Sequence, residues 1–185
     1  MSYTRFFAMI AVSTVVMFVL MYFNTYALEH VRFSETRVYM ALLMGAAMAI
    51  IMLSFMLGMY KSRGLNAAIL AVALLVFGAS LWLVRSQQTI GDVAYMEAMI
   101  PHHSIAIMTS ERAHIKDPEV RKLADGIIDA QVREIVEMKR DISRLEANPP
   151  SANASDLPSY RERGEKPPPA ETDETAGIDT TKVPR

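Results

Sequence analysis

Long apolar runs separated by short polar connections fill the first half of the chain. The runs cover residues 6–27, 38–60 and 65–84, and none of them contains a charged residue. Each is long enough to cross about 30 Å of hydrocarbon as a helix. A chain in lipid must satisfy its backbone polar groups within the same segment, so these runs predict three transmembrane helices rather than strands. The first run is too long for a cleaved signal peptide and lacks a clear small-residue cleavage site, so we expect it to be retained.

The connections between these runs, LEHVRFSETR and KSRG, are short. Neighbouring helices should therefore be antiparallel, and the ends of the three-helix region should lie on opposite sides of the membrane. Lys and Arg are balanced between the two sides, so the positive-inside rule barely separates the two orientations. We favour a cytoplasmic N-terminus, because the chemistry described below suits a C-terminal region outside the cytoplasm.

From residue 89 to residue 147 the apolar positions recur at spacings of three and four, which predicts amphipathic helices. Thr89 or Asp92 can cap the first helix. In the sequence KDPEV, Asp117 is suited to cap the second helix and Pro118 to occupy its first position. We expect helices at 92–115 and 118–146, antiparallel because their connection is short. The predicted fold class is all-α, with three transmembrane helices followed by a helical hairpin outside the membrane.

The two helices of the hairpin are expected to face each other through one stripe of residues each. A turn at Lys116 brings His103 near Gln131 and Met99 near Glu134. Histidine, glutamine and glutamate need polar partners when they are buried, so this seam predicts more than packing. The first stripe consists of Met96, Met99, His103, Ile107 and Ser110, and the second of Leu123, Ile127, Gln131, Glu134 and Met138.

The composition changes again at residue 148. Seven of the nine prolines follow it, with few aliphatic residues, so we expect a disordered spacer. A recognition motif in KPPPAE is the alternative. The predicted domains are a transmembrane region at 1–87, a helical hairpin at 88–147 and a disordered tail at 148–185.

Cysteine is absent from the chain, and the formal net charge is −1. Disulfides, thiolate metal sites and thiol catalysis are thereby excluded. No basic stripe is present, which argues against nucleic acid as a partner. A soft metal ion would have to be held by methionine or histidine.

Methionine and histidine gather in the sequence YMEAMIPHHSIAIM, at residues 95–108. Pro101 within a helix removes a hydrogen bond and clashes with the preceding turn, so it should kink the helix and free the carbonyl of Glu97. Thioether and imidazole groups that converge at such a kink favour copper, especially Cu(I). The alternatives are that Pro101 starts a new helix and that the histidines are surface or core residues. The predicted copper ligands are Met99, His102 and His103, with Met96, Met138 and Gln131 in support, and Glu134 and Asp92 orienting the imidazoles.

The sequences MIPHHSIAIM and LADGIIDAQVREIVEM resemble the domain of unknown function 305 (DUF305) family, a ferritin-like helical family. The resemblance extends from Asp92 to Met138. It implies an extracytoplasmic, often membrane-anchored bacterial protein of the inner membrane, and some members of the family bind copper through methionine and histidine. Larger members carry a four-helix bundle, whereas a single hairpin is predicted here. Because one hairpin has too small a core, we expect a homodimer or higher homo-oligomer to complete the bundle.

The second apolar run carries a methionine at every fourth position. This ridge resembles the Met-xxx-Met element of the three-helix copper transporters, but methionine is also an ordinary packing residue in helices, and we favour packing. The ridge consists of Met40, Met44, Met48, Met52 and Met56.

The leading functional hypothesis is a membrane-anchored protein, not an enzyme, that buffers copper outside the cytoplasm or exchanges it with a copper donor or acceptor protein. One alternative is a carboxylate-bridged di-iron oxidase built on Glu111 and His114, which have the i, i+3 spacing of ferritin-like sites. The others are a structural membrane protein whose hairpin mediates oligomerisation, and a copper transporter that uses the methionine ridge.

Overall fold

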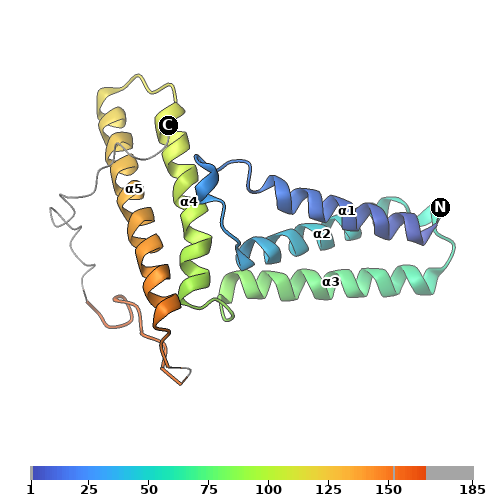
Figure 1. Cartoon of the computed structure of the whole chain (residues 1–185). Coiled ribbons are helices and arrows are strands. Elements are labelled where there is room, and N and C mark those ends of the chain that lie inside the picture. The colour runs from blue at the N-terminus through green and yellow to red at the C-terminus, as the bar shows by residue number, and fades with distance from the viewer. Residues whose placement is uncertain (1, 152, 166–185) are drawn as a thin grey trace. The chain divides into compact units, whose positions relative to one another are not determined.

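The computed structural model describes residues 2–151 and 153–165. Within these residues it contains five α-helices, two short 3₁₀ helices and no strand, which confirms the predicted all-α class (Figure 1). The chain divides into two compact units, and the division falls between His102 and His103, inside the fourth helix.

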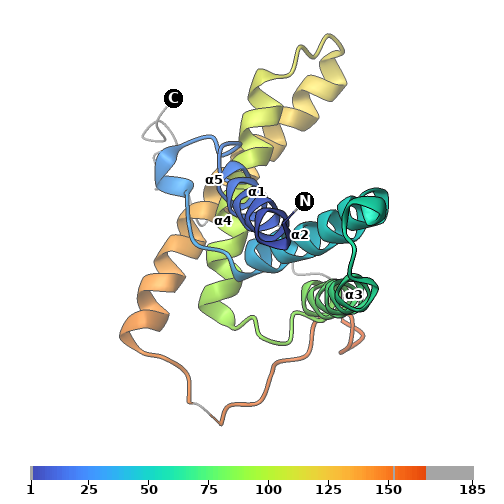
Figure 2. The ribbon, with the colours of Figure 1, turned by 90° about the vertical axis from the view of Figure 1, so that its right-hand side faces the viewer.

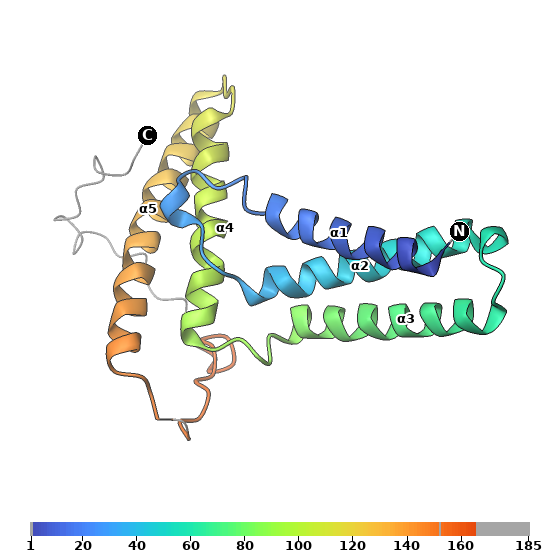
Figure 3. The same ribbon diagram turned by 45° about the vertical axis from the view of Figure 1, so that its right-hand side comes forward.

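Three helices of the first unit are long and apolar enough to cross a membrane. They are α1 (Tyr3–Leu20), α2 (Glu35–Phe55) and α3 (Arg63–Ser86). The three lie side by side in Figure 3, and Figure 2 views them nearly end-on. Short 3₁₀ helices follow α1 and α2, η1 at Leu28–His30 and η2 at Leu57–Met59.

A serine side chain caps the start of each of these three helices. Ser34, for example, accepts a hydrogen bond from the backbone N–H of Arg37, at 3.3 Å. Such a cap satisfies one of the N–H groups that a first helical turn leaves without an intrahelical partner. The caps explain why the helices begin before the apolar runs do. The three capping residues are Ser2, Ser34 and Ser62.

Small residues form the contact surface of α2. Ala41, Gly45, Ala49 and Leu53 are buried and recur every fourth residue. A Cβ added at Gly45 would clash with Oγ1 of Thr14, so α1 and α2 approach each other closely there. The methionine ridge begins one residue earlier and lies beside this surface. Met44, Met48, Met52 and Met56 are half-buried, and the last two pack against the core of the unit.

Tyrosine and asparagine side chains join the start of α1 to the start of α3. The Tyr3 hydroxyl donates to Oδ1 of Asn66, at 2.8 Å, and Nδ2 of Asn66 donates to the carbonyl of Tyr60, at 3.1 Å. The rings of Tyr3 and Tyr60 lie 4.8 Å apart. Asn66 and Tyr60 are both buried, so these hydrogen bonds satisfy polar groups that water does not reach.

The helical hairpin is formed by α4 (Asp92–Arg112) and α5 (Pro118–Ala147), close to the predicted ranges. The Asp117 carboxylate accepts a hydrogen bond from the backbone N–H of Val120, at 2.9 Å, so the predicted N-cap is confirmed. Helical backbone continues through Pro101, and the alternative in which Pro101 starts a new helix is wrong. The kink at Pro101 stays a prediction.

The buried face of α5 differs from the predicted stripe. Leu123 and Ile127, which were expected to face α4, are 65% and 36% exposed, whereas Ile135 is 3% exposed. The buried stripe is displaced by one residue, which on an α-helix is a rotation of about 100°. Gln131 and Met138 are half-buried at the edge of both stripes. The buried residues of α5 are Ala124, Val132, Ile135 and Ile142.

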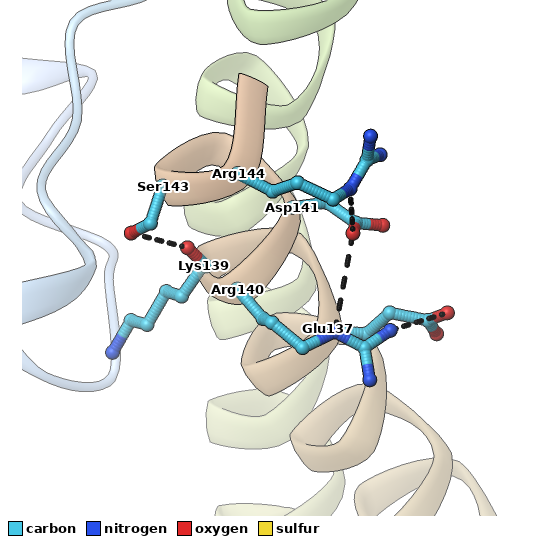
Figure 4. A network of polar contacts seen from close by, with 6 residues as sticks. All are labelled: Glu137, Lys139, Arg140, Asp141, Ser143 and Arg144. Carbon is cyan, nitrogen blue, oxygen red and sulfur yellow. Dashed lines mark hydrogen bonds and ion pairs between the residues drawn. The ribbon is translucent and has the colours of Figure 1, made fainter. Parts of the chain in front are cut away.

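Ion pairs cover the solvated side of the second half of α5 (Figure 4). Arg140 lies 3.6 Å from Glu137 and 3.9 Å from Asp141, and Arg144 lies 3.2 Å from Asp141. Two of the three pairs have the i, i+3 spacing that supports a helix, although exposed pairs stabilise only weakly. This side of α5 is therefore a surface exposed to water.

Candidate functional site

An imidazole and a carboxylate meet between α4 and α5 in the second unit. Nε2 of His103 lies 2.7 Å from Oε2 of Glu134, the length of a charge-assisted hydrogen bond. The His103 side chain is only 12% exposed, whereas that of Glu134 is 50% exposed. His103 is therefore held in one orientation by a carboxylate that itself remains in contact with water.

Gln131 joins the same carboxylate from one turn earlier in α5. Its Nε2 donates to Oε2 of Glu134, at 3.5 Å. The predicted pairing of His103 with Gln131 is thus displaced by one turn, because Glu134 makes the direct contact. The expectation that Glu134 orients an imidazole agrees with this geometry.

The six predicted ligands lie in both units. His103, Gln131 and Met138 belong to the second unit, and the structure brings the first two together at Glu134. Met138 lies two turns beyond Gln131 and is half-buried. The part of α4 that belongs to the first unit carries Met96, which is buried, Met99, which is half-buried, and His102, which is exposed.

Carboxylate and imidazole groups alone do not form a metal site in the described part of the chain. Within residues 2–151 and 153–165, no group of three or more His, Asp and Glu side chains is placed to hold a metal ion. Helix α4 ends at Arg112, so Glu111 and His114 do not share a helix and lose the i, i+3 geometry of a ferritin-like pair.

Arg121 is a positioning residue that the sequence analysis did not single out. Its guanidinium donates to the carbonyl of Ser110, at 2.9 Å, and lies 2.8 Å from Asp125. Among the residues that the structure describes, nothing forms a hydrogen bond with the buried Nε of Arg121. Arg121 thus ties the start of α5 to the last turn of α4. The i, i+4 spacing of Arg121 and Asp125 was the available signal, but it is common on helix surfaces.

Comparisons with known proteins place the hairpin in a family. Residues 86–183, which are 98 of the 185 residues, match the family model described as a domain of unknown function, DUF305. An uncharacterized protein of Acanthamoeba polyphaga mimivirus is 36% identical over 102 residues, which make up 54% of this chain and 65% of that protein. The chain thus spans just under two thirds of that relative's length. No solved structure matches the chain.

Proposed function

The chain belongs to the DUF305 family, and from this premise we propose that it is a membrane-anchored protein that binds copper outside the cytoplasm through methionine and histidine. It buffers the ion or exchanges it with a donor or acceptor protein, and no catalytic step is required. The three apolar helices anchor the site at the outer face of a bacterial inner membrane.

The observation that carries this proposal is the contact between His103 and Glu134. A histidine that binds a metal with one ring nitrogen commonly donates from the other to a carboxylate, which fixes the ring and raises its basicity. His103 makes such a contact at 2.7 Å, and its side chain is largely withdrawn from water. The protein therefore sets the orientation of the His103 ring through Glu134.

Methionine supplies the soft ligands. Met99 precedes His103 by four residues in the sequence, and on a regular helix this spacing places two side chains on the same face. Met96 lies three residues before Met99 and extends the same face. Thioether and imidazole groups together favour Cu(I) over Mg²⁺ or Ca²⁺. The exposed His102 is the ligand through which we expect the ion to enter.

The test is a titration of the full chain in detergent with Cu(I), in competition with a chromophoric chelator. The double variant His102→Ala, His103→Ala should lose tight binding. Glu134→Gln should weaken binding about tenfold or more, as the loss of a carboxylate that orients a ligand does. His114→Ala is the matched control, because His114 is exposed and lies beyond the end of α4.

Native affinity in the double variant would refute the copper site. Equal losses in the double variant and in His114→Ala would show that the titration reports nonspecific binding by histidine. Purified protein that contains iron in place of copper would favour the di-iron alternative.

A further inference from the structure

A cavity opens on the side of the three-helix region, between α1 and α3 and over α2. Its volume is about 420 Å³, which is within the range of cavities that bind small molecules. Ala46 and Ala49 of α2 are buried and form its floor, whereas Phe7 of α1 and Val72 of α3 form its rims and are 52% and 61% exposed. The cavity is thus open sideways, along helices that are long and apolar enough to cross a membrane. We refer to it as the lateral groove.

The lining of the lateral groove gives a polar ligand nothing to bind. Among the described residues that line it, Thr14 is the only polar one. The Thr14 hydroxyl donates a hydrogen bond to the carbonyl of Ile10, at 2.8 Å, so its proton is already used. A ligand with a polar group inside the groove would leave that group without a partner, which is unfavourable. The groove therefore favours a plain hydrocarbon chain.

The length of the lateral groove matches one leaflet of a bilayer. Along α3 the groove extends from Leu65 to Val76, which is about 16 Å at the rise of an α-helix. Along α1 it extends from Phe6 to Thr14, within the first two thirds of that helix. The hydrocarbon core of a bilayer is about 30 Å thick, so one leaflet supplies about 15 Å. A transmembrane helix of another chain would need a groove along the whole core, whereas an acyl chain needs one leaflet.

Basic side chains gather at the end of the helices from which the lateral groove starts. Arg5 belongs to the first turn of α1, and Lys61 and Arg63 flank the serine that caps α3. All three are exposed. The hydrogen bond from the Tyr3 hydroxyl to Asn66 holds these two helix starts together. Helical side chains lean toward the start of their helix, which directs both arginines toward the lipid head groups.

The charge at this end is not balanced by carboxylates in the neighbouring sequence. Residues 1–28 and 36–91 contain no Asp or Glu. The opposite end of the three-helix region differs, because Glu29 and Glu35 accompany its arginines. Basic pockets between transmembrane helices bind anionic lipid head groups. The end at which the groove starts therefore complements a phosphate, and the groove itself complements the chain attached to it.

We propose that the lateral groove binds one acyl chain of an anionic phospholipid, whose phosphate lies at the helix ends that carry Arg5, Lys61 and Arg63. The occupant is a lipid of the surrounding membrane, held by apolar contact and by charge together. The proposal rests on the membrane anchoring that the proposed function includes. It does not depend on copper, since none of these residues is a proposed ligand.

Quenching of tryptophan fluorescence by brominated lipids provides the test. Trp82, the only tryptophan of the chain, is replaced by phenylalanine, and Phe7→Trp places a single tryptophan on the rim of the groove. Phe55→Trp in the same background is the matched control. Phe55 ends α2 at the same end of the helices, is 89% exposed and is not among the residues that line the groove. The full chain of each variant is placed in phosphatidylcholine vesicles that contain a minor fraction of brominated phosphatidylglycerol or brominated phosphatidylcholine.

We expect brominated phosphatidylglycerol to be preferred over brominated phosphatidylcholine at Phe7→Trp. The preference should exceed that at Phe55→Trp about fivefold or more, the factor expected for even one basic side chain at an anionic surface. Phe55→Trp reports the general enrichment of anionic lipid around the same charges. Equal preferences at the two positions would overturn the lipid site while leaving the membrane anchoring intact. Absence of quenching at both positions would show that the helices lie outside the bilayer, and would refute the anchoring as well.

Two adjacent alanines of α3 separate filling of the groove from a general effect of a larger side chain. Ala68 lines the groove and Ala67 does not, and both are exposed. Ala68→Phe added to Phe7→Trp should abolish the preference for phosphatidylglycerol, because the phenylalanine occupies the groove. Ala67→Phe should leave the preference unchanged. Equal effects of the two variants would contradict the groove as the binding site, and circular dichroism shows whether each variant remains helical.

Neutral variants test the role of charge. Arg5→Gln, Lys61→Gln and Arg63→Gln together should make the two brominated lipids equal quenchers of Phe7→Trp, with quenching itself retained, because the groove still accepts a hydrocarbon chain. A preference that persists in this triple variant would refute the assignment of the phosphate. If both lipids quench Phe7→Trp much less than Phe55→Trp, lipid is excluded from the groove, and a protein segment rather than an acyl chain occupies it.

Discussion

Ile135 and Ile127 are a matched pair of isoleucines on α5 that shows which face holds the hairpin together. Ile135 is 3% exposed and Ile127 is 36% exposed. Ile135→Ala removes buried methyl and methylene groups and leaves a cavity, which costs about 2–4 kcal/mol of unfolding free energy. Ile127→Ala removes the same atoms from a position open to solvent, where no closed cavity forms. Its cost should be about 1 kcal/mol or less.

Hydrogen exchange read by mass spectrometry measures this difference directly. The full chain is studied in detergent, at a dilution at which it is monomeric, and the exchange of the α5 amides is followed. A difference of about 1.4 kcal/mol corresponds to a tenfold difference in protection. We therefore expect α5 to lose at least ten times more protection in Ile135→Ala than in Ile127→Ala.

The comparison also distinguishes the two stripes of α5. The sequence pattern placed Ile127 against α4, whereas the structure buries Ile135 and leaves Ile127 exposed. A loss of protection in Ile127→Ala that equals or exceeds the loss in Ile135→Ala would show that the predicted stripe is the packed one.

Two further predictions concern the close helix contact and the helix cap. Gly45→Leu should lower the thermal unfolding midpoint measured by circular dichroism in detergent, by the equivalent of about 1–3 kcal/mol, because the leucine side chain meets Thr14. Gly78→Leu is the control and should change the midpoint little, because Gly78 has open space around it. Equal effects of the two variants would contradict the close approach of α1 and α2. Asp117→Ala should lower the unfolding free energy by about 1 kcal/mol and increase amide hydrogen exchange in the first turn of α5. Asp117→Asn should have a smaller effect, because asparagine retains an acceptor for the Val120 N–H. Equal hydrogen exchange in the two variants would argue against the cap.

The helices could be predicted from the sequence because the responsible signals are local. Three signals each act within a few residues. They are apolar runs without a charged residue, apolar positions that recur at spacings of three and four, and Asp117 followed by Pro118. The end of α1 could not be predicted in this way. The apolar run continues to residue 27, but α1 ends at Leu20, and Tyr22 accepts a hydrogen bond from the Ser34 N–H, at 3.2 Å, and lies under the guanidinium of Arg37. Residues twelve and fifteen positions later thus fix the chain after α1.

The packed face of α5 could not be predicted for a different reason. The helix carries two adjacent apolar stripes, and periodicity identifies both without showing which one is buried. One stripe includes Ile128 and Ile135, and the other includes Leu123 and Ile127. Gln131 lies between the two stripes. The partner of His103 was predicted one turn too early along α5, although the type of interaction was anticipated.

The hydrogen bonds between Tyr3, Asn66 and Tyr60 have a practical consequence for labelling this protein. They bind the first helical turn of the chain to the start of α3, and Ser2, which caps that turn, lies immediately before them. A bulky tag fused directly before Ser2 would compete with these contacts and loosen the end of the three-helix group to which it is attached. A reporter for membrane orientation should therefore be attached after the hairpin, or through a flexible spacer if the amino end must be used.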